Sequence, residues 1–236
     1  MLAVRAVRGY RTISFEAASL LAGALPWDLE ARTLASLYAW RKEKEASVGR
    51  PAPRETEGRR DELRQVQVAE WADRLLNPSA GLATIQAVRP IMPEWLQRRY
   101  GTLTFRLTQV LTGHGCFGRY LCRIRREQTS GCHHCVGGDE DTALHTLQVC
   151  PAWDEQRRDL VAAVGADLSL PAVVKAMVGS ADAWDAARTT ERHLGPFLHT
   201  SFNFIYFYLR YHHVLVKLRA CCVVVNCNRG TKRLRA

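Results

Sequence analysis

The sequence has no apolar run long enough to cross a membrane. The only candidate, residues 196–209, contains 14 uncharged residues, whereas a membrane-spanning helix needs about 20. The N-terminal segment also lacks the uninterrupted apolar stretch of a secretory signal, because Arg5, Arg8 and Arg11 break it. We therefore expect an intracellular protein, whose eight cysteines are thiols or metal ligands rather than disulfides.

The glycine-rich loops with which many enzymes bind nucleotides are also missing. Neither G-x-x-x-x-G-K-[ST] nor a G-x-G-x-x-G that follows a strand occurs. The glycines of T-G-H-G-C-F-G, residues 112–118, alternate with histidine and aromatic residues that do not suit a phosphate cradle. The acidic run at 138–141 is better explained as the start of a helix than as a site for two magnesium ions. The residues themselves thus predict no catalytic site.

Acidic residues are absent after Glu191, and this absence divides the net charge of +10 unevenly. The tail beyond Glu191 carries eight basic residues, while residues 1–191 hold 25 basic and 23 acidic ones, a net charge of +2. Such a tail could neutralise nucleic-acid phosphates, or it could be a solvated end that binds nothing in particular.

The periodicity predicts a mainly α fold, in which helical segments flank a small metal-binding loop. Ser14 and Gly23 suit the two ends of a short helix, residues 26–46 and 60–79 are amphipathic, and residues 93–127 read as helices broken near Gly101 and at 112–115. We expect helical segments at 1–50, 61–128 and 161–195, a linker at 51–60, a metal-binding segment at 129–160, and a basic tail of uncertain structure at 196–236.

The most informative motif is C-x2-C-x9-H-x4-C, formed by Cys132, Cys135, His145 and Cys150. Zinc prefers four tetrahedral thiolate or imidazole ligands, and four protein ligands leave no position for water, so the site would be structural. His145 and Cys150 could not face one ion from an unbroken helix, but Pro151 pushes the residue before it out of helical geometry.

The remaining histidines and cysteines are weaker candidates. His133 and His134 could replace a ligand, although within the C-x2-C turn we expect them to point away. The spacing of His114, Cys116 and Cys122 fits no metal pattern, and buried thiols are the simpler interpretation. Three cysteines in the tail have no paired ligand set: Cys221, Cys222 and Cys227.

Several motifs together resemble the region downstream of the polymerase in non-LTR retrotransposon polyproteins. These are L-T-Q-V-L-T-G-H-G at 107–115, C-H-H-C at 132–135, L-H-T-L-Q-V-C-P-A-W at 144–153 and the opening segment of residues 5–32. The likeness is greatest to arthropod type-1 elements that insert into ribosomal RNA genes, and it covers about residues 1–160. It departs from the family at G-L-A-T, residues 81–84, and ends after about Gly195.

This resemblance implies a place within a larger enzyme. The parent would combine an endonuclease with a reverse transcriptase, an RNA-directed DNA polymerase that uses Mg²⁺, and would act in the nucleus at the site of integration. Residues 1–50 would follow the polymerase thumb, and the C-C-H-C set would be the family's zinc knuckle. No Y-x-D-D motif is present here, so the catalytic acids would lie in upstream domains.

Two functions from different classes follow. In the first, this segment binds template RNA or target DNA, with stacking and cationic contacts from residues just before the zinc loop: His114, Phe117, Arg119, Tyr120, Arg123, Arg125 and Arg126. In the second, it is a structural cap that docks on the polymerase and touches no nucleic acid. An independent cellular zinc-finger protein is a third, weaker reading.

Overall fold

The computed structural model describes the backbone of residues 2–198 and the side chains of residues 2–189. The chain divides into one compact unit of residues 1–191 and a second that begins at Arg192, and the sites described below all lie in the first. The predicted tail lies outside the described residues, apart from 196–198 at the end of a helix. The three cysteines of the tail, Cys221, Cys222 and Cys227, and most of the candidate apolar segment 196–209 also lie outside the described residues.

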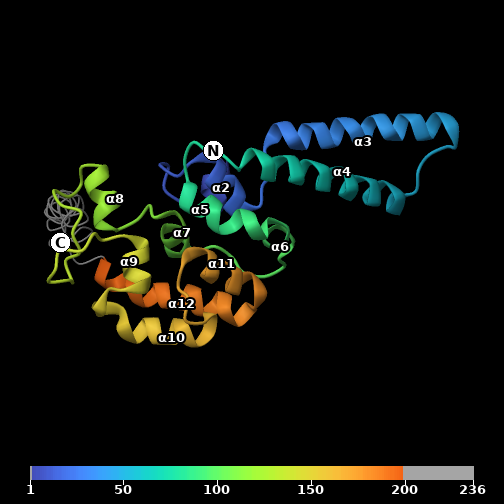
Figure 1. The fold of residues 1–236 in the computed structure, drawn as a ribbon. Helices are drawn as coiled ribbons and strands as arrows, with labels where there is room; N and C mark the ends of the chain where they lie inside the picture. The colour runs from blue at the N-terminus through green and yellow to red at the C-terminus, as the bar shows by residue number, and fades with distance from the viewer. Residues whose placement is uncertain (1, 199–236) are drawn as a thin grey trace, which may run out of the picture. The chain divides into compact units, whose positions relative to one another are not determined.

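The described part of the chain is helical, which confirms the predicted fold class (Figure 1). It contains no strand, and its one β-bridge joins Gly131 to Glu140. None of its helices combines the length and the apolar character that a membrane span requires. The elements are α1 Leu2–Ala6, α2 Phe15–Ala22, α3 Trp27–Ser47, α4 Pro53–Arg74, α5 Leu82–Val88, η1 Arg89–Ile91, α6 Met92–Gln97, α7 Phe105–Thr112, α8 Gly118–Arg123, α9 Ala143–Gln148, η2 Pro151–Trp153, α10 Asp154–Val164, α11 Leu170–Gly179 and α12 Ala181–Leu198.

Helix α2 has the two ends that its sequence predicts. The Ser14 hydroxyl accepts a hydrogen bond from the Ala17 N–H at 3.1 Å, which satisfies one of the free amide groups of the first turn. Gly23 adopts the left-handed conformation, with φ of +63°, and its N–H bonds to the carbonyl oxygen of Leu20. Local chemistry is therefore sufficient to define this helix.

The prediction of a linker at residues 51–60 is wrong for most of that range, because α4 begins at Pro53. Proline suits the first turn of a helix, where an N–H group is not needed, and Glu55 in that turn forms an ion pair of 2.8 Å with Lys44 of α3. The mixed charge that suggested a linker instead belongs to the exposed surface of a helix. Residues 48–52 alone connect α3 to α4, and the two helices pair as a long hairpin (Figure 1).

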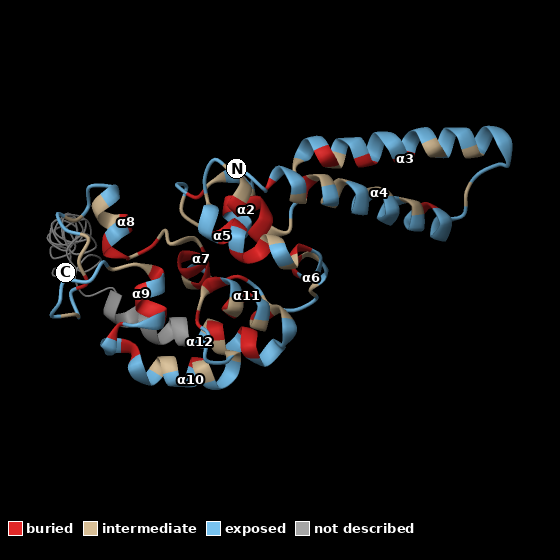
Figure 2. Cartoon of the chain, viewed as in Figure 1, coloured by how far each residue is buried: buried red, intermediate tan, exposed pale blue. Residues whose placement is uncertain are grey.

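Ion pairs connect the two helices of this hairpin. Arg32 of α3 contacts Glu70 of α4 at 2.7 Å, and Arg74 of α4 contacts Asp28 of α3 at 2.6 Å. These groups are half-exposed, so water screens each pair and it contributes little to stability. Most of the hairpin surface is exposed (Figure 2), and much of its charge is neutralised by such internal pairs.

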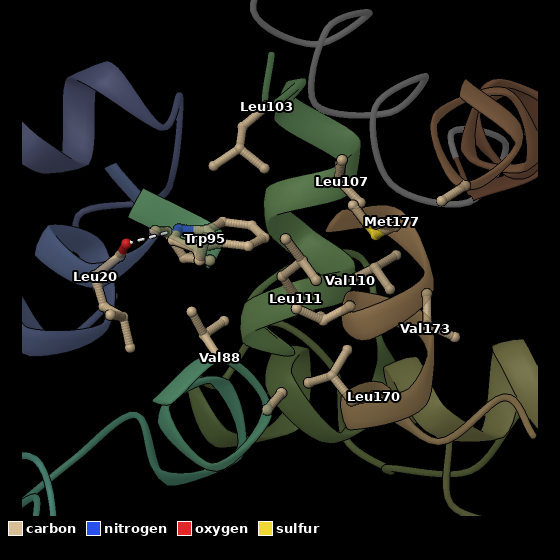
Figure 3. Close-up of a cluster of buried hydrophobic side chains, with 14 of the residues drawn as sticks. Leu20, Val88, Trp95, Leu103, Leu107, Val110, Leu111, Leu170, Val173 and Met177 are labelled. Carbon is tan, nitrogen blue, oxygen red and sulfur yellow. Dashed lines mark hydrogen bonds between the residues drawn. The ribbon is translucent and has the colours of Figure 1, made fainter. Parts of the chain in front are cut away.

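The core lies among α2, α5, α6, α7 and α11 (Figure 3). Trp95 is completely buried at its centre, and its indole N–H donates to the carbonyl oxygen of Leu20 at 2.9 Å. Val88, Leu107, Leu111 and residues of α11 belong to the same buried cluster (Figure 3). Because α7 contributes to this core and leads directly into α8, the helix that precedes the metal-binding loop is anchored on a packed support.

Candidate functional site

The cysteine-rich loop is closed by backbone hydrogen bonds between residues 130–132 and 139–141. The Cys132 N–H donates to the Asp139 carbonyl oxygen at 2.7 Å, and the Asp141 N–H donates to the Ser130 carbonyl oxygen at 2.8 Å. Gly138 makes the return turn possible, since its φ of +71° is rarely adopted by residues with a side chain. The loop therefore presents Cys132 and Cys135 from a closed, hydrogen-bonded turn.

The structure brings together the four side chains of the C-x2-C-x9-H-x4-C motif. One ligand atom from each of Cys132, Cys135, His145 and Cys150 lies within 4.8 Å of the others. The sulfur of Cys132 is 3.8 Å from that of Cys150, the sulfur of Cys135 is 4.0 Å from that of Cys150, and Cys135 Sγ is 3.3 Å from His145 Nε2. A tetrahedral zinc ion with Zn–S bonds of about 2.3 Å requires sulfurs about 3.8 Å apart, so the group can hold a metal ion of this kind.

Two features of α9 direct its ligands inward. Thr142 caps the helix by accepting the His145 N–H at 3.0 Å, which fixes the turn that carries the imidazole. Cys150 then leaves helical geometry, with φ of −59° and ψ of 120°, as the proline after it predicts. The acidic residues expected in the first turn of this helix lie before it instead, because the helix begins only at Ala143.

One of these acidic residues connects the loop to α8. The Asp141 carboxylate accepts the N–H of Gly118 at 2.7 Å, and the Arg119 N–H donates to the Asp141 carbonyl oxygen at 3.0 Å. Burial raises the pKa of the Asp141 carboxyl, while the bond from Gly118 acts in the opposite direction. Asp141 therefore satisfies the free amide groups at the start of α8, across 23 positions of sequence.

Arg157 of α10 fastens the other side of the site. Its guanidinium donates to the carbonyl oxygen of Leu147 at 2.9 Å and to that of Cys150, and it pairs with Asp154 at 2.5 Å. These bonds hold the carbonyl groups at the end of α9 and beside the last cysteine. The ligand geometry thus depends on a helix that follows the motif, a contact that the motif spacing does not reveal.

Burial keeps the Cys150 thiol protonated until a metal ion binds. Cys150 is 1% exposed, and burial, together with its neighbour Cys132, raises the pKa of its thiol to about 12. A divalent ion reverses this effect, since a coordinating thiol is deprotonated. Three sulfurs and one imidazole are also the donor set that zinc prefers. The residues present therefore fit a metal ion.

The alternative ligands stay outside this group. His133 and His134 are exposed, and His133 lies 3.6 Å from the Glu127 carboxylate while the ring of His134 meets the edge of Trp153. Cys116 and Cys122 are half-buried free thiols, and in the part of the chain that the structure describes they join no metal-binding group. The interpretation of both pairs as non-ligands agrees with this geometry.

The predicted nucleic-acid-binding residues divide into exposed and buried ones. Arg119, Arg123, Arg125 and Arg126 lie on the surface of α8 and the turn after it. Phe117 and Tyr120 are 2% and 5% exposed, so the expectation that they stack on bases is wrong. The Phe117 ring belongs to the buried core cluster, and the Tyr120 ring stacks on His114 and Tyr10.

His114 is half-buried and stacks on the ring of Tyr120 at 4.9 Å between centroids. Its imidazole also bonds to the Thr12 hydroxyl. Tyr10 stacks on Tyr120 as well, at 5.9 Å between ring centroids. The sequence pattern does not indicate a role for Tyr10 or Thr12. Nothing in the local sequence could have done so, since Thr12 and His114 are 102 positions apart.

Comparison with known proteins gives one informative match. The chain is 31% identical over 194 residues to the Retrovirus-related Pol polyprotein from type-1 retrotransposable element R1 4 of the wasp Nasonia vitripennis, an alignment that covers 78% of this chain and 48% of the relative. The chain thus spans about half the length of that protein. No family model and no solved structure matches. With the motifs already described, this match relates the chain, over most of its length, to a region of the Pol polyprotein of non-LTR retrotransposons.

Proposed function

We propose that this chain is a zinc-stabilised nucleic-acid-binding module that acts within a retrotransposon Pol polyprotein. The four-ligand group would bind structural zinc, and the arginines of α8 and the following turn would contact phosphates of template RNA or target DNA. The observation that carries the proposal is that these arginines lie on α8 and the turn after it, and that the first amide of α8 donates to Asp141 of the metal-binding loop. Metal binding would therefore hold the basic surface in shape.

The remaining features of the parent belong to the same proposal. A complete polyprotein would contain an endonuclease and an RNA-directed DNA polymerase, with Mg²⁺ in those upstream domains, and would act in the nucleus by target-primed reverse transcription. The present segment would supply binding rather than catalysis, with residues 129–160 as its zinc knuckle. Its partners would be the nucleic acid and the upstream domains.

A second candidate function is a structural cap that docks on another domain. It is favoured by an exposed apolar stripe on α3, where Trp27, Leu34 and Tyr38 are 75%, 50% and 64% exposed at helical spacing. The charged surface of α8 would then have no ligand. The two functions differ in whether the α8 arginines affect binding to nucleic acid.

The test replaces Arg123, Arg125 and Arg126 with glutamine. Because three cationic contacts are removed, we expect affinity for RNA or DNA to fall about ten- to hundredfold, and the slope of log K against log salt to decrease in magnitude by about 2 to 3. Fluorescence anisotropy with labelled single-stranded RNA and duplex DNA, over a series of salt concentrations, measures both quantities.

The matched control removes the same charge from the tip of the hairpin, at Arg41, Arg54 and Arg60. These arginines are exposed and form no ion pair among the described residues. Metal content and far-UV circular dichroism should stay unchanged in both triple variants. An equal loss of affinity in the control would mean that net charge alone drives binding. If the metal-loaded chain binds neither probe at low salt, the structural cap is the remaining function.

A further inference from the structure

Several exposed arginines outside the hairpin have no acidic partner. Two of them, Arg8 and Arg11, lie in the loop between α1 and α2, and the third is Arg123 of α8. In the described part of the chain, no carboxylate lies within ion-pair distance of these three side chains. By contrast, Arg32 and Arg74 of the hairpin are held by carboxylates of the paired helix. Arg41, Arg54 and Arg60 of the hairpin are also exposed without an ion pair, so what distinguishes the loop and α8 is the set of contacts that joins them.

Contacts between side chains join the two segments although they are about 100 positions apart in sequence. The Thr12 hydroxyl lies 3.1 Å from His114 Nδ1 and 2.7 Å from the Tyr120 hydroxyl. The Thr108 hydroxyl donates to the carbonyl oxygen of Val7 at 2.5 Å. The loop that carries Arg8 and Arg11 is thus fixed against α7 and α8.

The same contacts orient Arg123. Its guanidinium lies over the ring of Tyr120, 5.2 Å from the centroid, and its Nη2 donates to His114 Nε2 at 2.9 Å. Because arginine only donates, His114 Nε2 must accept, and the ring proton is then at Nδ1, from which it is donated to Thr12. Burial, and the charge of Arg123, lower the pKa of His114 to about 4, so the imidazole is neutral and able to accept at physiological pH.

This arrangement leaves most of the guanidinium available. Arginine has five N–H donors, and among the described residues Arg123 uses one of them, in the bond to His114. A fixed planar guanidinium without a carboxylate partner suits a phosphate, which it can contact through two parallel hydrogen bonds. Fixing the side chain beforehand also reduces the entropy that is lost on binding.

We propose that the loop of residues 8–12 and the α8 region form one phosphate-binding surface for nucleic acid, in which His114 is a positioning residue that holds the Arg123 guanidinium on Tyr120. The inference rests on the proposed nucleic-acid binding and adds a second segment and a positioning group to it. The ligand is the phosphodiester backbone, which RNA and DNA share.

The test for His114 is a double-mutant cycle in the full chain. Labelled oligouridylate and labelled duplex DNA are the two probes, and their comparison separates RNA from DNA as the source of the phosphates. We expect His114→Leu to weaken binding about three- to tenfold, and His114→Gln to restore it to within about twofold, because a glutamine oxygen can accept from Arg123. In an Arg123→Gln background, His114→Leu should have no further effect.

The test for the loop is the pair Arg8→Gln and Arg11→Gln. We expect this variant to lower the magnitude of the salt slope by about 1 to 2, since two phosphate contacts are lost, whereas the matched pair Arg41→Gln and Arg54→Gln should change it little. If His114→Leu weakens binding equally with and without Arg123, or if the two arginine pairs behave alike, the inference is wrong while the proposed function stands. If the unmodified chain binds neither probe, both fail.

Discussion

Replacement of Cys150 by serine is expected to abolish metal binding and to unfold the segment from α8 to α10. Cys150 is almost fully buried and lies about equally far from the sulfurs of Cys132 and Cys135. Loss of one ligand from a structural zinc site removes much of a binding free energy that is on the order of 10 kcal/mol, and in such sites binding energy is folding energy. The helical hairpin has its own packing and should keep its structure.

Three measurements check this expectation. Metal analysis of the purified chain should give one zinc per molecule, and none in Cys150→Ser. Substitution with Co²⁺ should produce the visible absorption of a tetrahedral thiolate site in the unmodified chain alone. Thermal unfolding should lose the transition of this segment, and addition of a chelator to the unmodified chain should have the same effect.

The matched control is Cys122→Ser, which changes a half-buried free thiol of α8 that lies outside the four-ligand group. It should retain one zinc ion and almost all of the stability. A Cys150→Ser chain with full metal content and an unchanged melting temperature would overturn the assignment of the metal site. Equal metal loss in both variants would mean that general damage to the fold, rather than a missing ligand, is the cause.

Replacement of Gly101 by alanine is expected to destabilise the fold by about 3 to 5 kcal/mol. Gly101 has φ of +82°, which is unfavourable for alanine, and a Cβ atom there would lie 2.3 Å from two ring atoms of Trp184. Trp184 is 1% exposed and packs against Trp95 at 5.7 Å between centroids, so its ring has no room to move away. The core and the connection from α6 to α7 would both be disturbed.

Gly113→Ala is the control for this prediction. Gly113 also has a positive φ, of +66°, but a Cβ atom at this position would meet nothing within 4 Å. Its cost should therefore be that of the backbone conformation alone, about 1 kcal/mol. Urea unfolding followed by tryptophan fluorescence measures both variants. Similar losses of stability would show that the contact with Trp184 does not limit the substitution.

The sequence was sufficient wherever the determining interaction is local. Ser14 and Gly23 identify both ends of α2, because a cap is a bond within a few residues. Pro151 correctly indicates that Cys150 leaves helical geometry, which the four-ligand group needs. The break near Gly101 was also predicted, although the sequence does not reveal that the site must be glycine to make room for Trp184.

Only the tertiary structure decided which side chains are accessible and which distant segments meet. An aromatic residue beside arginines has the same local pattern whether it faces a base or the core, and Phe117 and Tyr120 face the core. Residues 53–60 have the composition of a linker but form a helix, because pairing with α3 stabilises it. The bond from Thr12 to His114 joins segments 102 positions apart, and such contacts depend on the packing of the whole chain rather than on any local pattern.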